Sequence, residues 1–246
     1  MSFATINQNG VLLPDLIGPL LPLSILAGVM GLDVVSFPQA MISRPLVAAT
    51  VAGAFVGAPV AGLVCGAALE CLALESLPVG ASRYPEWGSA SVVAGSVAAY
   101  GAQGGALPRP GAFAVAIAVG IATAWLGSVS MIKLRRLIAA FARPRLDQLV
   151  AGNRNTVVGL QVFGMTADLV RGMLIGALAY LPAVLVAAWS EAHWSLPEDI
   201  TRASVITAVA AVAAASIWKD FHVISGTRRL FLVSLAVGTL LVVIGV

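Results

Sequence analysis

Single polar side chains interrupt long apolar stretches of this chain, and the most informative of them is Glu70. It lies in the segment GLVCGAALECLAL, where small residues occupy the neighbouring turns. A carboxylate held inside a hydrocarbon layer costs at least about 2.5–3.5 kcal/mol, so it must face a cavity or a partner. Three interpretations of Glu70 follow: an acceptor for a polar solute, a proton-linked acid, or the partner of an arginine in a structural ion pair.

A second group of polar residues, Asp33, Ser36 and Gln39, is spaced at intervals of three. On a helix these positions share one face and form a strip of donors and acceptors suited to a hydroxylated ligand. Glu86 follows a proline and precedes Trp87. It is interpreted either as an exposed loop residue or as a further acceptor for the ligand.

Two arginines, Arg44 and Arg171, precede apolar runs of similar pattern. Residues 168–179 (DLVRGMLIGALA) echo residues 41–52 (MISRPLVAATVA) when the two arginines are aligned. Inverted repeats are frequent in transporters, so the echo is either a trace of such a repeat or a chance likeness between apolar segments. The arginines, together with Pro45, are expected to have a structural or gating role, or the arginines snorkel to the lipid headgroups.

The composition identifies the solvent that surrounds these residues. Hydrophobic residues make up 59% of the 246 positions and charged residues only 10%, with a mean hydropathy of +0.97. A soluble domain has about 25% charged residues. We therefore predict an all-α, polytopic integral membrane protein, because helices satisfy their own backbone hydrogen bonds in lipid. The net charge of +3 is assigned to cytoplasmic loops and not to a nucleic-acid surface.

One membrane domain, residues 1–246, is expected, with full spans and broken spans side by side. Full spans are predicted at 111–131, 169–189, 203–218 and 230–246, whereas the apolar runs at 45–57, 60–74 and 89–100 are too short to cross. Residues 31–44 are too polar for lipid and are predicted to be re-entrant or cavity-lining. The domain is divided into a first half with broken helices (11–131), a basic cytoplasmic loop (132–155) and a second half (156–246). The first part of the basic segment is expected either as loop or as an amphipathic helix on the membrane surface.

Signatures of catalysis are missing from the sequence. It has no P-loop, HExxH or GxSxG motif, and its two cysteines lack the spacing and histidine partners of a metal site. Cys65 and Cys71 are interpreted as small buried hydrophobic residues. We predict no catalytic residue, no metal and no cofactor, so the chemistry of this chain rests on its intramembrane polar groups.

Three segments in order, SRPLVAATVAGAFVG, GLVCGAALECLAL and LPVGASRYPEWGSAS, carry a resemblance to a known family. They resemble the EIIC membrane component of the mannose/fructose/sorbose family of the bacterial sugar phosphotransferase system. The segment GLQVFGMTADLVRG also resembles a pattern in the second half of that family. The matching pairs are Arg44-Pro45, Leu69-Glu70, Gly80-Ala81 and Pro85-Glu86.

The resemblance implies a non-catalytic permease component of the bacterial cytoplasmic membrane that carries a hexose-type sugar by an elevator-type motion. It implies an EIID membrane partner, soluble EIIA and EIIB carriers phosphorylated on histidine, an oligomeric assembly, and no phosphorylated residue in this chain. The residues expected to bind sugar are Asp33, Ser36, Gln39, Glu70, Gly80, Ala81 and Glu86.

This chain departs from the family pattern at two places. Pro78 stands where many members have asparagine, and residues 57–59 (GAP) stand where members often carry Gly-Asp. Two alternatives therefore stay open beside sugar transport. One is a degenerate regulatory or scaffolding protein of the same fold, and the other is an unrelated proton-coupled secondary transporter.

Overall fold

Helices account for all the regular secondary structure that the computed structural model describes, which covers residues 18–74, 84–102, 107–221 and 225–244. The predicted all-α class is thus confirmed. The helices in chain order are α2 (Leu20–Asp33), α3 (Pro45–Val56), α4 (Pro59–Ala73), α5 (Trp87–Tyr100), α6 (Pro110–Ala142), η1 (Arg143–Arg145), α7 (Leu146–Val150), α8 (Arg154–His193), α9 (Glu198–Phe221) and α10 (Thr227–Ile244).

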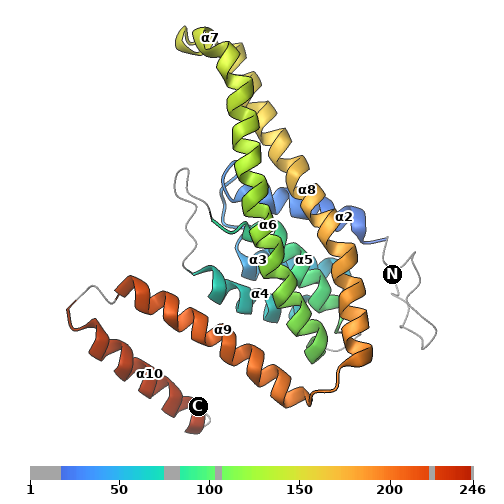
Figure 1. Cartoon of the computed structure of the whole chain (residues 1–246), viewed down its shortest axis with the longest axis vertical. Helices are drawn as coiled ribbons and strands as arrows, with labels where there is room; N and C mark the ends of the chain where they lie inside the picture. The colour runs from blue at the N-terminus through green and yellow to red at the C-terminus, as the bar shows by residue number, and fades with distance from the viewer. Residues whose placement is uncertain (1–17, 75–83, 103–106, 222–224, 245–246) are drawn as a thin grey trace.

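Two long helices form the frame of the molecule. Helices α6 and α8 run antiparallel, with α7 at the tip that joins them (Figure 1). They contain 33 and 40 residues. At 1.5 Å per residue they are about 50 and 60 Å long, which exceeds the ~30 Å hydrocarbon core of a bilayer. Within the described residues, three segments are long and apolar enough to cross a membrane, Pro110–Val150, Arg154–His193 and Glu198–Lys219.

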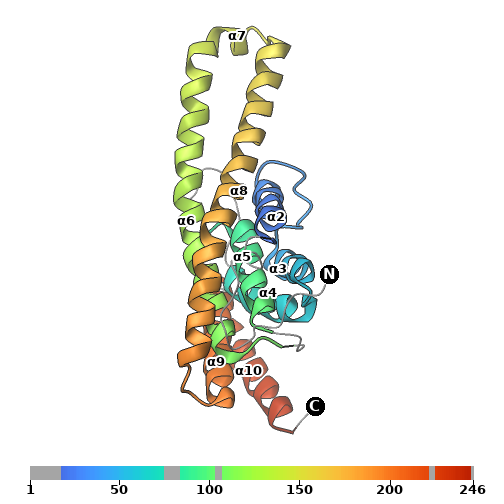
Figure 2. The ribbon, with the colours of Figure 1, turned by 90° about the vertical axis from the view of Figure 1, so that its right-hand side faces the viewer.

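Short helices pack across this frame. Helices α2, α3 and α4 contain 14, 12 and 15 residues and lie across the long axis of α6 and α8 (Figures 1 and 2). At about 18–22 Å each, they are too short to span a bilayer. The predicted combination of full spans and broken helices is therefore what the structure contains.

Helix α5 lies at the centre of the core. It is buried at every position from Gly88 to Ala99 and is covered by α2, α3, α4, α6 and α8. Its Gly, Ala, Ser and Val side chains allow neighbouring backbones to approach closely, as is typical of helix contacts in membranes. Outside this core, α9 packs against α4 and α6, and α10 contacts α9.

The predicted break between the two short apolar runs is confirmed at residues 57–59. Helix α3 ends where Gly57 adopts a left-handed conformation with φ of 92°, and α4 starts at Pro59. Glycine adopts positive φ without strain, and proline is well suited to the first turn of a helix. These two local preferences fold α3 and α4 into a tight hairpin.

The basic segment 132–155 is mostly helical, so of the two expectations for its first part the helix holds and the loop does not. Helix α6 continues to Ala142, followed by η1 and α7, and α8 starts after Asn153. The sequence KLRRLIAAFA contains mostly good helix formers and neither glycine nor proline, so nothing ends α6 at its first charged residue. The Asn153 side chain then accepts hydrogen bonds from the Asn155 and Thr156 amides and caps α8. We call residues 132–155 the arm; its cytoplasmic location stays a prediction.

The segment 31–44 does not meet the condition on which the shared face depended, because it is not helical throughout. Helix α2 ends at Asp33, and Gln39 and Met41 have positive φ values of 57° and 61°. Asp33, Ser36 and Gln39 therefore do not share a helix face. Pro38 is the physical reason, because proline lacks an amide proton and disfavours helical geometry in the residue before it.

Candidate functional site

A pocket of about 340 Å³ opens where the segment after α2 faces the segment before α5. We call residues 33–45 the first wall and residues 84–87 the second wall. The predicted cavity-lining character of residues 31–44 is thus confirmed. The described lining residues are Asp33, Val34, Gln39, Met41, Ser43, Arg44, Pro45, Ala73, Tyr84, Pro85 and Trp87.

Asp33 organises the first wall. Its side chain is buried, and its two carboxylate oxygens accept hydrogen bonds from the amides of Ala40 (2.7 Å) and Ser43 (2.9 Å). The carboxylate therefore folds residues 34–43 into a fixed loop at the end of α2. Gln39 lies exposed on this loop, where its side-chain nitrogen donates to the Val35 carbonyl at 2.5 Å. Of the three residues predicted to form one strip, the pocket is lined by Asp33 and Gln39.

Ser36, the third member of that strip, is not among the lining residues. Its hydroxyl donates a 2.7 Å hydrogen bond to Oδ2 of Asp168 on α8. Ser36 thus connects the first wall to a long helix.

Glu86 organises the second wall from within the core. The residue is fully buried and caps α5, with Oε1 accepting from the Ser89 amide (3.0 Å) and Oε2 from the Ser89 hydroxyl (2.5 Å). Its own amide donates to the Ala124 carbonyl on α6 at 2.9 Å. A Cβ at Gly127 would lie 2.7 Å from the Glu86 Cβ, so glycine is what allows this close approach. Glu86 holds its neighbours Tyr84 and Trp87 at the pocket and does not line it.

Glu70 forms the ion pair that one interpretation of its role requires. Its Oε1 accepts from the Arg44 Nε at 2.6 Å, and its Oε2 accepts from the Leu46 amide at 3.1 Å. Arg44 precedes α3, and Pro45 is the first residue of that helix. The pair therefore joins the start of α3 to α4, while Arg44 and Pro45 also line the pocket. Gly80 and Ala81, the remaining predicted sugar ligands, lie outside the described residues.

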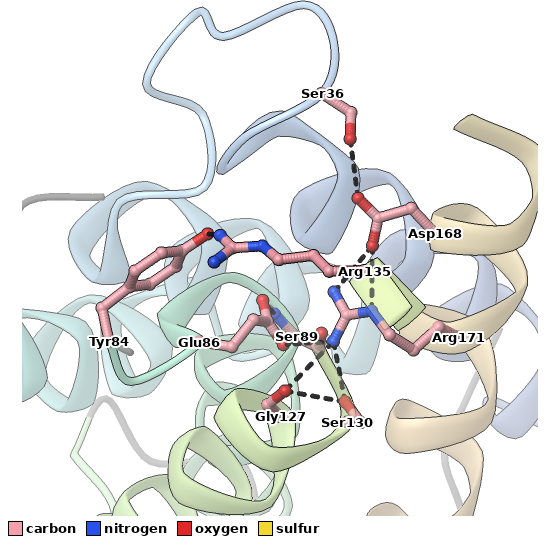
Figure 3. A network of polar contacts seen from close by, with 9 residues as sticks. All are labelled: Ser36, Tyr84, Glu86, Ser89, Gly127, Ser130, Arg135, Asp168 and Arg171. Carbon is pink, nitrogen blue, oxygen red and sulfur yellow. Dashed lines mark hydrogen bonds and ion pairs between the residues drawn. The ribbon is translucent and has the colours of Figure 1, made fainter. Parts of the chain in front are cut away.

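Arg171 lies at the centre of a buried polar cluster (Figure 3). Its guanidinium contacts Oδ1 of Asp168 through Nε (2.9 Å) and Nη2 (2.8 Å). Its Nη1 donates to the Ser130 hydroxyl at 3.0 Å and the Gly127 carbonyl at 3.4 Å, both on α6. The same Nη1 is 4.0 Å from Oε2 of Glu86. Helices α5, α6 and α8 thus meet at one cation.

The two arginines aligned in the sequence echo have different local structures. Arg44 is the residue before α3, with extended backbone, whereas Arg171 lies inside the 40-residue helix α8. The alignment therefore does not mark equivalent positions of a repeat.

Several members of the cluster were not predicted from the sequence. Asp168 stands out there only as part of the echo, although a carboxylate three residues before an arginine in an apolar helix is a signal for a buried ion pair. Glu86 was predicted there as a loop residue or a sugar acceptor, and its role as a helix cap has no sequence signal, because glutamate is not among the usual N-cap residues. Arg135, which the sequence placed in a basic loop, donates from Nη2 to the Tyr84 hydroxyl at 3.0 Å and so contacts the second wall. No local pattern links those two positions.

The fold and the pocket define a class: a polytopic helical membrane protein whose pocket lies among short, broken helices. Residues 19–190 match the family model described as the sorbose-specific IIC component of the phosphotransferase system. Because the match covers more than half of the chain, the protein belongs to this family of EIIC membrane components, as the sequence resemblance indicated.

Two curated relatives agree with that assignment, and one solved structure shares the fold. The fructose permease IIC component of Bacillus subtilis (strain 168) is 28% identical over 182 residues, 73% of this chain and 63% of the relative. The sorbose-specific EIIC component of Klebsiella pneumoniae is 27% identical over 161 residues, 65% of this chain and 56% of the relative. This chain thus spans less than two thirds of either relative. A solved structure titled "Structure of membrane protein" shares the fold, with a TM-score of 0.64, 22% identity and 96% of each chain covered.

Proposed function

We propose that this chain is the sugar-translocating EIIC component of a phosphoenolpyruvate-dependent phosphotransferase system in the bacterial cytoplasmic membrane. Its substrate is a hexose-type sugar bound between the two walls of the pocket. The family assignment supports the class of transporter, and the pocket supports the place of binding.

The chemistry of the pocket is the observation that carries this proposal. A volume of about 340 Å³ falls within the usual range of small-molecule sites. Trp87 and Tyr84 supply aromatic faces on one wall, and Gln39, Ser43 and Arg44 supply hydrogen-bonding groups on the other. An aromatic face opposite polar groups suits a ligand with an apolar C–H face and a rim of hydroxyls. Asp33 contributes by holding the polar wall in place, and Glu70 by holding Arg44.

The phosphoryl group in this proposal comes from soluble EIIA and EIIB carriers phosphorylated on histidine, as the resemblance to the EIIC family implies. An EIID membrane partner and an oligomeric assembly complete the proposed complex.

Sugar phosphorylation in membranes tests the proposal directly. Membranes containing this chain with its EIIA, EIIB and EIID partners are expected to phosphorylate at least one sugar in a panel of hexoses, fructose and sorbose included. The reaction should depend on phosphoenolpyruvate. Trp87→Ala should lower this activity at least tenfold, because it removes the largest aromatic face of the pocket.

The control is Trp189→Ala, since Trp189 is exposed on α8 and does not line the pocket. Equal losses in the two variants would contradict the proposed pocket. An assembled complex that phosphorylates no sugar would contradict the function and favour a regulatory or scaffolding role. Sugar uptake that needs no phosphoryl donor and stops with the proton gradient would identify a proton-coupled transporter instead.

A further inference from the structure

The two walls of the pocket are connected to the same buried guanidinium. The first wall reaches it through Ser36, whose hydroxyl donates to Asp168, which in turn holds Arg171 (Figure 3). The second wall reaches it through Glu86, whose Oε2 lies 4.0 Å from Arg171 Nη1. Ser36, acting through Asp168, and Glu86 therefore link the two walls to the cation on α8.

The two carboxylate oxygens of Asp168 accept hydrogen bonds from different residues. Oδ1 accepts from Arg171 at 2.9 Å, and Oδ2 accepts from Ser36 at 2.7 Å. The Asp168 and Arg171 side chains are only 3% and 8% exposed. The buried ion pair holds the carboxylate in a fixed direction, and a hydrogen bond to an acceptor of an ion pair is stronger than one between neutral groups. Asp168 therefore offers Ser36 a rigid anchor.

The same cluster is anchored to the frame on its other side. Arg171 contacts Ser130 and the Gly127 carbonyl of α6, and Glu86 packs against Gly127 and bonds the Ala124 carbonyl. The second wall is thus fastened to α6 by backbone and close packing. The first wall, by contrast, reaches α8 through a serine hydroxyl.

We propose that Asp168 is a positioning residue for the sugar pocket: it anchors the first wall through Ser36 and so sets the spacing between the two walls. This inference rests on the proposed function for its ligand, a hexose-type sugar. Loss of the Ser36 bond releases residues 34–43 from α8, although Asp33 still organises them internally. The pocket then spends part of its time too wide for one sugar to contact both walls, and affinity falls because only a fraction of the protein is competent to bind.

Ser36→Ala is the primary variant, because it deletes one hydroxyl and leaves the Asp168–Arg171 ion pair intact. Asp168→Asn is the second variant, and Ser36→Thr is the conservative variant, which keeps a hydroxyl donor. Ser24→Ala is the matched control. The Ser24 hydroxyl donates within α2, to the Leu20 carbonyl at 2.6 Å, so its removal breaks no bond between elements.

Hydrogen exchange of the purified complex measures the first wall without any sugar. The peptide that contains residues 34–44 is expected to exchange about tenfold faster in Ser36→Ala and in Asp168→Asn than in the wild type. Ser24→Ala and Ser36→Thr should exchange at the wild-type rate. Unchanged exchange in both Ser36→Ala and Asp168→Asn would overturn the proposal.

Sugar phosphorylation by the same variants separates positioning from a general structural role. With the best sugar of the wild type, Ser36→Ala should raise the KM about tenfold and change kcat less than twofold, and Ser36→Thr should restore the KM. A faster exchange with an unchanged KM would also overturn the proposal. If the wild-type complex phosphorylates no sugar, the proposed function fails, and the exchange rates alone decide whether Asp168 anchors the first wall.

Discussion

Two arginine–carboxylate pairs flank the pocket, and they differ most in their burial. The Arg44 and Glu70 side chains are 37% and 23% exposed, whereas those of Arg171 and Asp168 are 8% and 3% exposed. The exposed pair joins the ends of two short helices, and Arg44 faces the pocket. The buried pair joins a long helix to the first wall and contacts α6.

Because the two pairs differ in burial, we expect them to have different roles. A partly exposed ion pair contributes little to stability, on the order of 0–1 kcal/mol, and its arginine remains accessible to a ligand. A buried pair contributes through the cost of breaking it, since either partner alone is left as an unsolvated charge. Burial therefore favours sugar contact at Arg44 and rigidity at Arg171, although the sequence grouped both arginines together as structural or gating residues.

The largest effect is expected at the buried pair. Arg171→Leu leaves the Asp168 carboxylate without its cation and removes the guanidinium that lies 4.0 Å from Glu86. We expect the free energy of unfolding to fall by about 3–5 kcal/mol, measured by thermal unfolding of the complex in detergent. Adding Asp168→Leu to Arg171→Leu should recover part of this loss, because the unpaired carboxylate is then removed. A loss below about 1 kcal/mol for Arg171→Leu would show that the two pairs are equivalent.

The sequence predicted the elements of the fold well because their signals are local. Gly57 and Pro59 end one helix and start the next, and the predicted limits of the three short runs agree with α3, α4 and α5 to within two residues. The arm was predicted less well: its first part was expected as a loop or a separate surface helix, whereas Lys133 to Ala142, which contains neither glycine nor proline, continues α6.

The candidate site was harder to predict because its contacts join distant positions. Ser36 and Asp168 are separated by 132 residues, and Tyr84 and Arg135 by 51. Residue type alone marked Glu86 and Glu70 as important but could not distinguish a helix cap or an ion pair from a sugar ligand. The spacing of three between Asp33, Ser36 and Gln39 was likewise consistent with a shared helix face. In the structure, however, the helix ends before Pro38.

A smaller effect on stability is expected at the exposed pair. Glu70→Gln keeps an oxygen that can accept from the Leu46 amide but removes the charge that holds Arg44. The free energy of unfolding should fall by no more than about 1 kcal/mol. The KM for sugar should nevertheless rise severalfold, because Arg44 is no longer held against the pocket. Thermal unfolding and phosphorylation kinetics measure the two effects, and Glu70→Asp, which keeps the charge, should stay closer to the wild type.

A stability loss in Glu70→Gln as large as that in Arg171→Leu would contradict the distinction by burial. An unchanged KM in Glu70→Gln would contradict the role given to Glu70, because Arg44 would then be held at the pocket by another residue.

The smallest effect on stability is expected for two arginines of the arm that lie at the surface. Arg143 and Arg145 are not buried, and Arg145 donates to the Phe141 carbonyl one turn earlier in the chain. Their replacement by glutamine should change the free energy of unfolding, measured by thermal unfolding in detergent, by no more than about 0.5 kcal/mol. Their expected role is topological, since basic residues beside a span are retained in the cytoplasm.

Cysteine labelling at the tip of the arm tests on which side of the membrane the arm lies. Val150 is 82% exposed at the end of α7, so Val150→Cys should react with a membrane-impermeant maleimide. Reaction is expected in inverted vesicles and not in intact cells, and the wild type, with Cys65 buried and Cys71 half-buried, provides the background. Labelling from outside intact cells would place the arm on the opposite face. The contacts that hold the pocket walls would be unchanged, but Arg135 and its neighbours would lie on the side of the membrane opposite any cytoplasmic phosphoryl carrier.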